Sequence, residues 1–303
     1  HKPMAKRHFP IEYSRNSTLT VFLESLSYHL KGAKLFADKI LSAPRTSPTR
    51  MLDIGAGDGQ FSTALVSSLL TRGHRVSNIL AIDPDPDNLL RFQQRLEPTD
   101  FRVSTLVGEF ENLPSLVPES RDVVIASHSL YELLENPSIS DEFIIDVIQQ
   151  LRKSTAPRRV LLFSLAGEGS PAYRVKAEVL STLRIEDRSA YGEQLLKLLT
   201  KASLDAEIEF IKYSSYMDAS YALKDPEHTS AWIRYFCRLT HEEYSRLGWG
   251  TAAEILRNHA VELRRLSGEM QKEFLEYPAY CGSPTPSTLV LPHTETLIVL
   301  KKN

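Results

Sequence analysis

Three glycines alternate with other residues in the segment MLDIGAGDGQ, which begins at Met51. They are Gly55, Gly57 and Gly59, and Asp53 closes the apolar run just before them. Glycine lets a backbone come close to a ligand because no Cβ atom stands between the two. The segment therefore predicts a binding loop between a strand and a helix, with a carboxylate near the end of the strand.

Two familiar ligands are excluded by the details of this loop. A dinucleotide site requires the spacing G-x-G-x-x-G, but Gln60 stands where the third glycine belongs. A phosphate-binding P-loop requires a Lys followed by Ser or Thr, and neither follows here. Asp53 would repel a pyrophosphate and suits a ligand with positive charge. S-adenosylmethionine carries an ammonium and a sulfonium and no phosphate, so we predict it as the cofactor and S-adenosylhomocysteine as its product.

Further acids follow the next two predicted strands. Asp83 ends the second strand, where an acid can accept hydrogen bonds from both ribose hydroxyls. Glu109 follows the third strand and could accept from the adenine amino group, with Phe110 beside the ring. Each acid taken alone fits a helix cap or a turn equally well. Ligands of open α/β sheets, however, lie outside the carboxyl ends of the strands, where all of these acids are expected. The predicted cofactor-binding residues are Asp53, Gly55, Gly57, Gly59, Asp83, Pro84, Glu109, Phe110 and Ser127.

The elements that must position these residues alternate along the chain. From residue 50 to residue 167, continuously apolar strands alternate with helices, which is typical of a parallel sheet covered on both faces. Further strands are expected at 207–218 and 294–302, and one continuous helix at 17–43. If the last two strands pair antiparallel, the helical segments between them project as a cap.

The segments MLDIGAGDG, LAIDPD and GEFENLP together resemble the motifs of the class I S-adenosylmethionine-dependent methyltransferases. The resemblance implies an α/β Rossmann-like, seven-stranded, mostly parallel sheet of order 3-2-1-4-5-7-6 with the seventh strand antiparallel. The expected parts are an N-terminal helical lid segment at 1–46, an S-adenosylmethionine-binding methyltransferase domain at 47–220 and 291–303, and a helical cap or substrate-binding insertion at 221–290.

A narrower resemblance concerns the leading helix FLESLSYHLKGAKLFADKIL, the loop SHSLYEL and the final LVLPHTETLIVL. These segments are similar to the histamine N-methyltransferase family, in which a leading helix and a cap enclose a small amine. The three polar residues with which that family contacts its imidazole substrate fall here at Tyr28, His128 and His293. This replacement argues against histamine as the substrate and leaves the acceptor open.

Methyl transfer is an in-line displacement, so the protein must mainly hold the nucleophile about 3 Å from the methyl group. The loop after the fourth strand should face that methyl. His128 lies in this loop, and because histidine side chains in general titrate near neutral pH, it could serve as a general base or as an orienting group. It could equally bond a backbone carbonyl or the cofactor carboxylate. The predicted catalytic residues are His128, Tyr131, His293 and Tyr28.

The composition of the chain indicates which classes of partner and which cellular compartment to expect. The formal net charge of −2 offers no electrostatic reason to expect nucleic acid. Two cysteines without a CxxC spacing predict neither a disulfide framework nor a metal site. No apolar run is long enough to span a membrane. We expect a cytoplasmic enzyme with a small-molecule partner, for which a monomer is a plausible state.

The predicted function is N-methylation of a small amine, an amino-acid-derived compound or a natural product in a capped aromatic pocket. One alternative keeps the cofactor for non-methylating work, as a cyclase or a binding subunit. Another is a protein or RNA methyltransferase, which the near-neutral charge and the bulky cap disfavour. An NAD-dependent dehydrogenase is disfavoured by Gln60 and Asp53.

Overall fold

The computed structural model describes residues 18–43, 48–110, 120–202, 204 and 206–302. The chain forms two compact units. The first, called the sheet unit here, comprises Tyr28–Glu168, Ala190–Ser214 and Thr294–Asn303. The second, called the helical unit, comprises His1–Ser27, Gly169–Ser189 and Ser215–His293.

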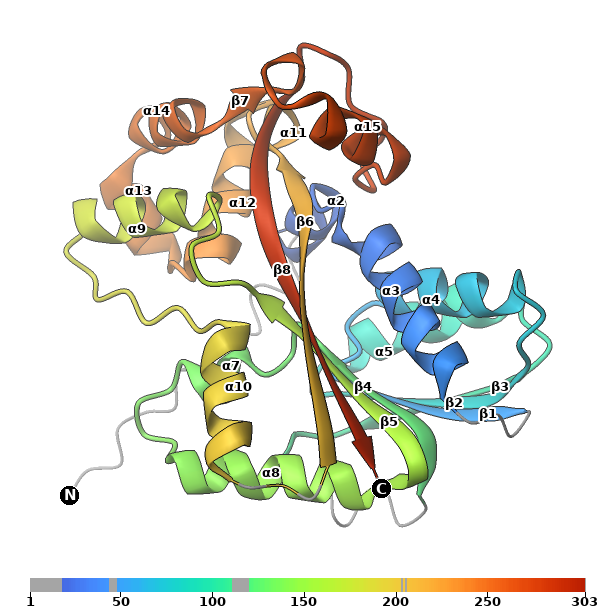
Figure 1. The fold of residues 1–303 in the computed structure, drawn as a ribbon. Helices are drawn as coiled ribbons and strands as arrows, with labels where there is room; N and C mark the ends of the chain where they lie inside the picture. The colour runs from blue at the N-terminus through green and yellow to red at the C-terminus, as the bar shows by residue number, and fades with distance from the viewer. Residues whose placement is uncertain (1–17, 44–47, 111–119, 203, 205, 303) are drawn as a thin grey trace. The chain divides into compact units, whose positions relative to one another are not determined.

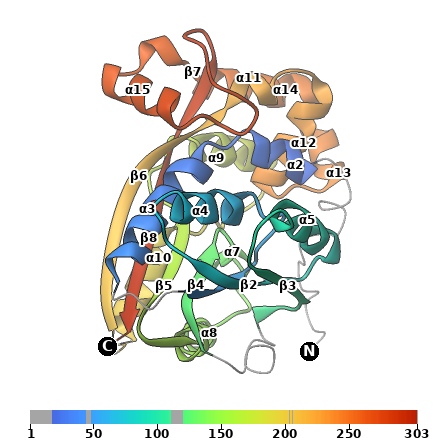
Figure 2. The same cartoon turned by 90° about the vertical axis from the view of Figure 1, so that its right-hand side faces the viewer.

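The sheet unit alternates strands and helices, as the apolar pattern predicts. Its strands are β1 (Thr49–Ile54), β2 (Val76–Asp83), β3 (Arg102–Val107), β4 (Arg121–Ser127), β5 (Thr155–Ala166), and parts of β6 (Ala206–Asp218) and β8 (Leu289–Lys302). Its helices are α3 (Tyr28–Ser42), α4 (Gln60–Leu70), α5 (Pro86–Leu96), α7 (Tyr131–Leu134), α8 (Asp141–Lys153) and α10 (Gly192–Lys201). Within this unit, α3, α4 and α5 lie on one face of the sheet and α8 and α10 on the other (Figures 1 and 2).

The sheet is mostly parallel. β1 pairs in parallel with β2 and β4, β2 with β3, and β4 with β5, whereas β8 runs antiparallel to β5. The order is β3-β2-β1-β4-β5-β8-β6, and β7 (Val261–Glu262) pairs with β8 off this path. The α/β fold with a mostly parallel sheet is therefore confirmed.

The predicted seven-strand order needs one correction. Among the described residues the sheet has eight strands, so the last long strand is the eighth in chain order. The extra strand arises because β8 begins at Leu289, well before the predicted 294, and its early part pairs with Val261 and Glu262.

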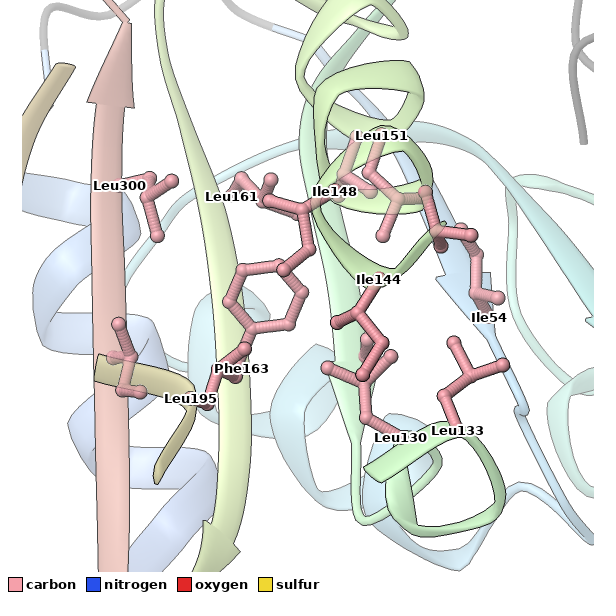
Figure 3. Close-up of a cluster of buried hydrophobic side chains, with 14 of the residues drawn as sticks. Ile54, Leu130, Leu133, Ile144, Ile148, Leu151, Leu161, Phe163, Leu195 and Leu300 are labelled. Atoms are coloured by element: carbon pink, nitrogen blue, oxygen red, sulfur yellow. The ribbon is translucent and has the colours of Figure 1, made fainter. Parts of the chain in front are cut away.

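Apolar side chains of alternate strand positions form the core that fixes the strands. Leu52, Ile54, Leu161 and Phe163 belong to one buried cluster, into which α8 and α10 also send apolar side chains. Figure 3 shows Phe163 in this cluster with Ile144, Ile148 and Leu195 nearby. Burying such side chains contributes roughly 1.5–3 kcal/mol each. This packing fixes the carboxyl ends of the strands, where the glycine loop and the loops after β2, β3 and β4 begin.

The helical unit is built mainly of helices. Its elements are α2 (Thr18–Glu24), α9 (Tyr173–Thr182), α11 (Ala219–Ala222), α12 (Pro226–Cys237), α13 (His241–Leu247), α14 (Trp249–His259), β7, a 3-10 turn η2 (Leu263–Arg265) and α15 (Gly268–Glu276). α12 contacts α2, α9 and α14. The rings of Phe22, Trp232 and Phe236 pack together, with centroids 4.8–5.6 Å apart. These three aromatic side chains therefore belong to the hydrophobic core of the helical unit.

The single helix predicted at 17–43 is wrong, because α2 ends at Glu24 and α3 begins at Tyr28. The intervening backbone bonds to β6 instead. Ser27 N–H donates to the Tyr216 carbonyl at 3.0 Å, and Asp218 N–H donates to the Ser25 carbonyl at 2.8 Å. The partner strand lies far along the chain, so helical periodicity alone could not reveal this break.

The two compact units divide the chain in another way than the predicted parts at 1–46, 47–220 with 291–303, and 221–290, which stay predictions. α3 packs on α4 and belongs to the sheet unit, not to a separate N-terminal segment. α9, within Gly169–Ser189, packs on α12 and α14 and belongs to the helical unit. The roles of lid and cap stay predictions. Across the described part of the chain, no helix is long and apolar enough to cross a membrane.

Candidate active site

The glycine loop after β1 has a left-handed backbone at all three glycines. The φ angles of Gly55, Gly57 and Gly59 are 66°, 57° and 86°. A Cβ atom at Gly55 would lie 2.2 Å from the Ser129 Cβ, and one at Gly59 would lie 3.0 Å from the Phe92 ring. A Cβ atom at Gly57 would meet nothing within 4 Å. Packing thus requires the first and third glycines, whereas the middle one borders open space.

The loop is held in place by the end of β2. Gly55 N–H and Ala56 N–H both donate to the Ile82 carbonyl, at 2.8 and 3.1 Å. Asp83 accepts from Gly57 N–H through one oxygen and from Asp85 N–H through the other, each at 2.9 Å. Burial raises the pKa of Asp83, and these two N–H groups act against that rise. The carboxylate therefore joins the glycine loop to the turn before α5.

Asp53 lies near the end of β1, where it was predicted, but it is only 3% exposed. Its side chain accepts a hydrogen bond from the Ser62 hydroxyl on α4. Burial raises the pKa of Asp53 to about 7, the Ser62 bond lowers it, and the charge of Asp83 raises it further. A buried carboxyl of this kind gains negative charge when a cation comes close.

The residues that follow β2 and β3 lie next along the edge of the sheet formed by the carboxyl ends of its strands. Gly108 N–H donates to the Asp83 carbonyl at 3.2 Å, which places the start of the β3 loop beside the end of β2. Pro84 and Glu109 are exposed, and Phe110 is half-buried against the apolar cluster of Figure 3. Their predicted contacts with ribose and adenine stay predictions.

Two serines at the end of β4 carry buried hydroxyl groups. Ser127 Oγ and Ser129 Oγ are inaccessible to solvent and have no hydrogen-bond partner among the described residues. Leaving a buried hydroxyl unpaired costs about 1–3 kcal/mol, so such groups mark a place where a ligand can supply the missing partner. Because Ser129 touches Gly55, this place adjoins the glycine loop.

His128 stands between these serines in a strained conformation. Its φ of 52° lies in the left-handed region, which is uncommon for residues other than glycine. Its backbone N–H donates to the Ser164 carbonyl of β5 at 2.9 Å. The imidazole lies among side chains from several elements.

The imidazole of His128 contacts other polar and aromatic side chains of the sheet unit. Its Nδ1 lies 3.0 Å from Tyr131 Oη, and its Nε2 lies 3.0 Å from Glu295 Oε2 and 3.2 Å from Ser164 Oγ. The ring centroid of Tyr28, the first residue of α3, lies 4.5 Å from that of His128. The structure thus brings together three of the predicted catalytic residues: His128, Tyr131 and Tyr28.

Glu295 and Ser164 are members of this group that the sequence analysis missed. Glu295 is 1% exposed on β8, and Ser164 is equally buried on β5. One signal was present, since Glu295 lies in a predicted buried strand just before its apolar run LIVL, and an acid is almost never fully buried unless it is paired. Nothing local, however, connects this acid with His128.

His293 belongs to the helical unit, whereas the other three predicted catalytic residues belong to the sheet unit. Its Nδ1 lies 2.5 Å from Ser170 Oγ, and its ring stacks on Tyr173 at 5.9 Å between centroids. It is 4% exposed. Its catalytic role stays a prediction. Among the described residues, no group of three or more His, Cys, Asp or Glu side chains could hold a metal ion.

Sequence comparison connects this site with a known family. Residues 51–154 match the family described as a methyltransferase domain. The malonyl-[acyl-carrier protein] O-methyltransferase of Methylococcus capsulatus is 34% identical over 125 residues, which are 41% of this chain and 40% of that protein. The match therefore spans less than half the length of that curated relative.

Solved structures with a similar fold have little sequence in common with this chain. The YcgJ protein from Bacillus subtilis has a TM-score of 0.50 and 14% identity, over 90% of this chain and 99% of that chain. A methyltransferase from Thiobacillus denitrificans in complex with S-adenosyl-L-homocysteine has a TM-score of 0.49 and 14% identity, over 96% and 98%. Residues 51–154, which contain the glycine loop, Asp53 and Asp83, are thus similar to a methyltransferase domain.

Proposed function

We propose that this chain transfers a methyl group from S-adenosylmethionine to a small molecule, at the nitrogen of a small amine, an amino-acid-derived compound or a natural product. The observation that carries the proposal is the pairing of Asp83 with Gly57. The Asp83 carboxylate accepts a hydrogen bond from the backbone N–H of Gly57, the residue at which a Cβ atom would meet open space. Carboxylate and backbone therefore border open space, in which a ligand without phosphate would lie.

The residues along this edge suit the parts of S-adenosylmethionine, which supplies an electrophilic methyl group when bound. Asp83 has lone pairs left to accept from ribose hydroxyls. Ser127 Oγ and Ser129 Oγ would pair with the amino-acid end of the cofactor. Asp53 is too deeply buried for open contact, so it would act through its negative charge, which a nearby cation favours.

Other observations support the proposed position of the cofactor's adenine and the proposed class of methyl acceptor. Glu109 and Phe110 follow β3 beside Asp83 and would border the adenine. The near-neutral net charge fits a small-molecule acceptor better than nucleic acid. The sequence segments that resemble the histamine N-methyltransferase family are our reason for proposing nitrogen as the methylated atom.

Methylation at oxygen is a second candidate. The curated relative from Methylococcus capsulatus is named as an O-methyltransferase. The polar group around His128 is suited to removing a proton, which a hydroxyl requires and a neutral amine does not.

Binding of the cofactor is tested by titration calorimetry with S-adenosylhomocysteine. Asp83→Ala removes the acceptor of two backbone N–H groups, and losing hydrogen bonds to a charged group should weaken binding roughly 10- to 100-fold. Asp87→Ala is the matched control, because Asp87 is an exposed acid in the first turn of α5. His128→Ala should bind normally and lose turnover, measured as labelled methyl transfer to a panel of small amines and hydroxyl compounds.

The proposal fails if the folded wild-type chain gives no heat with S-adenosylmethionine or S-adenosylhomocysteine. It also fails if Asp83→Ala and Asp87→Ala bind equally well. Each variant is compared with the wild type by circular dichroism, so that a loss of binding is not confused with unfolding.

A further inference from the structure

The polar contacts of His128 indicate which of its nitrogens carries the proton. Nε2 lies 3.0 Å from Glu295 Oε2 as a close polar contact, and 3.2 Å from Ser164 Oγ as a hydrogen bond. An unprotonated Nε2 would place its lone pair against the Glu295 carboxylate, so we expect the proton of a neutral imidazole on Nε2. This leaves Nδ1 as the acceptor, 3.0 Å from Tyr131 Oη.

The same reasoning gives a direction to the next bond. Ala166 N–H donates to Tyr131 Oη at 2.8 Å, so this oxygen already accepts one hydrogen bond. With the imidazole proton on Nε2, the Tyr131 hydroxyl donates to His128 Nδ1. In that arrangement the three groups follow one another from Tyr131 through His128 to Glu295, and Ala166 N–H of β5 holds the Tyr131 oxygen.

A buried carboxyl lies beside the imidazole of His128. Glu295 is 1% exposed, and a buried carboxylate is costly unless an opposite charge compensates it. Burial raises the pKa of Tyr213, and the negative charge of Glu295 adds to that rise. The remaining ring beside His128 is Tyr28, which brings no opposing positive charge. A positive charge that His128 gains during proton transfer would therefore lie beside the Glu295 carboxyl.

We propose that Tyr131, His128 and Glu295 form a proton relay, in which Tyr131 takes the proton of the methyl acceptor and Glu295 positions His128. The inference rests on the proposed function. Both ring nitrogens of His128 lie within hydrogen-bond distance of protein groups, so the proton enters at the half-buried Tyr131.

The step balances in protons and electrons. The bond between the acceptor atom and its hydrogen breaks, and its electron pair forms the bond to the methyl carbon, while the carbon–sulfur pair stays on sulfur. The acceptor's proton passes to Tyr131 Oη as the hydroxyl proton moves to His128 Nδ1. The positive charge lost from sulfur appears on the imidazolium, which donates through Nε2 to Glu295.

The relay defines a class of acceptor. Its nucleophilic atom arrives carrying a proton that must leave, as in a hydroxyl compound or a primary ammonium. Tyramine carries both groups on one small aromatic molecule, so mass spectrometry of its methylated product would distinguish oxygen from nitrogen.

The direction of the relay is tested by nitrogen NMR of the full chain labelled with ¹⁵N-histidine. The His128 signals are assigned with His128→Gln. We expect neutral His128 to carry its proton on Nε2, to lose that preference in Glu295→Gln, and to regain it in Glu295→Asp. A merely structural role for Glu295 would not change the tautomer. A proton on Nδ1 in the wild type overturns the relay.

Turnover provides the second measurement. Tyr131→Phe keeps the ring but removes the hydroxyl, and we expect at least a tenfold fall in kcat with unchanged S-adenosylhomocysteine binding, since acid–base groups contribute about 10²–10⁴-fold. Full activity of Tyr131→Phe also overturns the relay. Absence of S-adenosylhomocysteine binding in the wild type would instead refute the proposed function, so the two failures are distinguishable.

Discussion

Alanine substitutions at glycines with similar φ angles would separate backbone strain, packing and ligand contact. Gly55, Gly57 and Gly73 have φ angles of 66°, 57° and 72°, so alanine in each place costs about 1–2 kcal/mol of backbone strain. A Cβ atom at Gly73 would meet nothing within 4 Å, and this residue lies after α4, outside the glycine loop. Gly73→Ala therefore measures the strain alone.

Gly55→Ala adds a collision to the same strain. Its Cβ would lie 2.2 Å from Ser129 Cβ, whereas carbon atoms pack at about 3.5–4.0 Å. Relieving such overlap in a packed interior costs about 1–3 kcal/mol. We expect a total loss of about 2–5 kcal/mol in the free energy of unfolding, measured by urea unfolding followed by circular dichroism.

Gly57→Ala places its Cβ in the open space beside the loop. We expect it to be destabilised no more than Gly73→Ala, yet to bind S-adenosylhomocysteine at least about tenfold more weakly, because the methyl group occupies the ligand's place. Equal stability losses in Gly55→Ala and Gly73→Ala would refute the packing argument. Unchanged binding by Gly57→Ala would refute the placement of the ligand.

Two further predictions concern buried polar groups. The pKa of Asp53 is about 7 in the folded chain against an ordinary 3.8, so the unfolded chain releases this proton first as the pH rises. Its contribution to stability therefore falls between about pH 4 and pH 7 by a few kcal/mol, and urea unfolding of Asp53→Asn should show a flatter decline than the wild type. Ser25 Oγ accepts from the buried Trp232 Nε1 at 2.9 Å, so Ser25→Ala should lower the free energy of unfolding by about 1–3 kcal/mol. The exposed Ser42→Ala should change it by less than about 0.5 kcal/mol, and equal effects of the two variants would contradict this account.

The sequence alone determined the parts of the site that lie within one short segment. Apolar strands alternating with helices predict the parallel sheet, and the carboxyl ends of such strands share one edge. Asp53, the glycines and Asp83 each follow directly from their own strand and turn, so their placement depends on local geometry. The exclusion of a dinucleotide by Gln60 required nothing more than spacing.

Only the tertiary structure decided which distant residues meet. The break between α2 and α3 exists because β6 supplies backbone partners for Ser25 and Ser27. Glu295 reaches His128 because β8 pairs beside β5, and His293 belongs to the helical unit with Ser170 and Tyr173. Periodicity and spacing record the neighbours of a residue along the chain, whereas these contacts depend on which strands pair, and strand pairing is settled by the packing of the whole sheet.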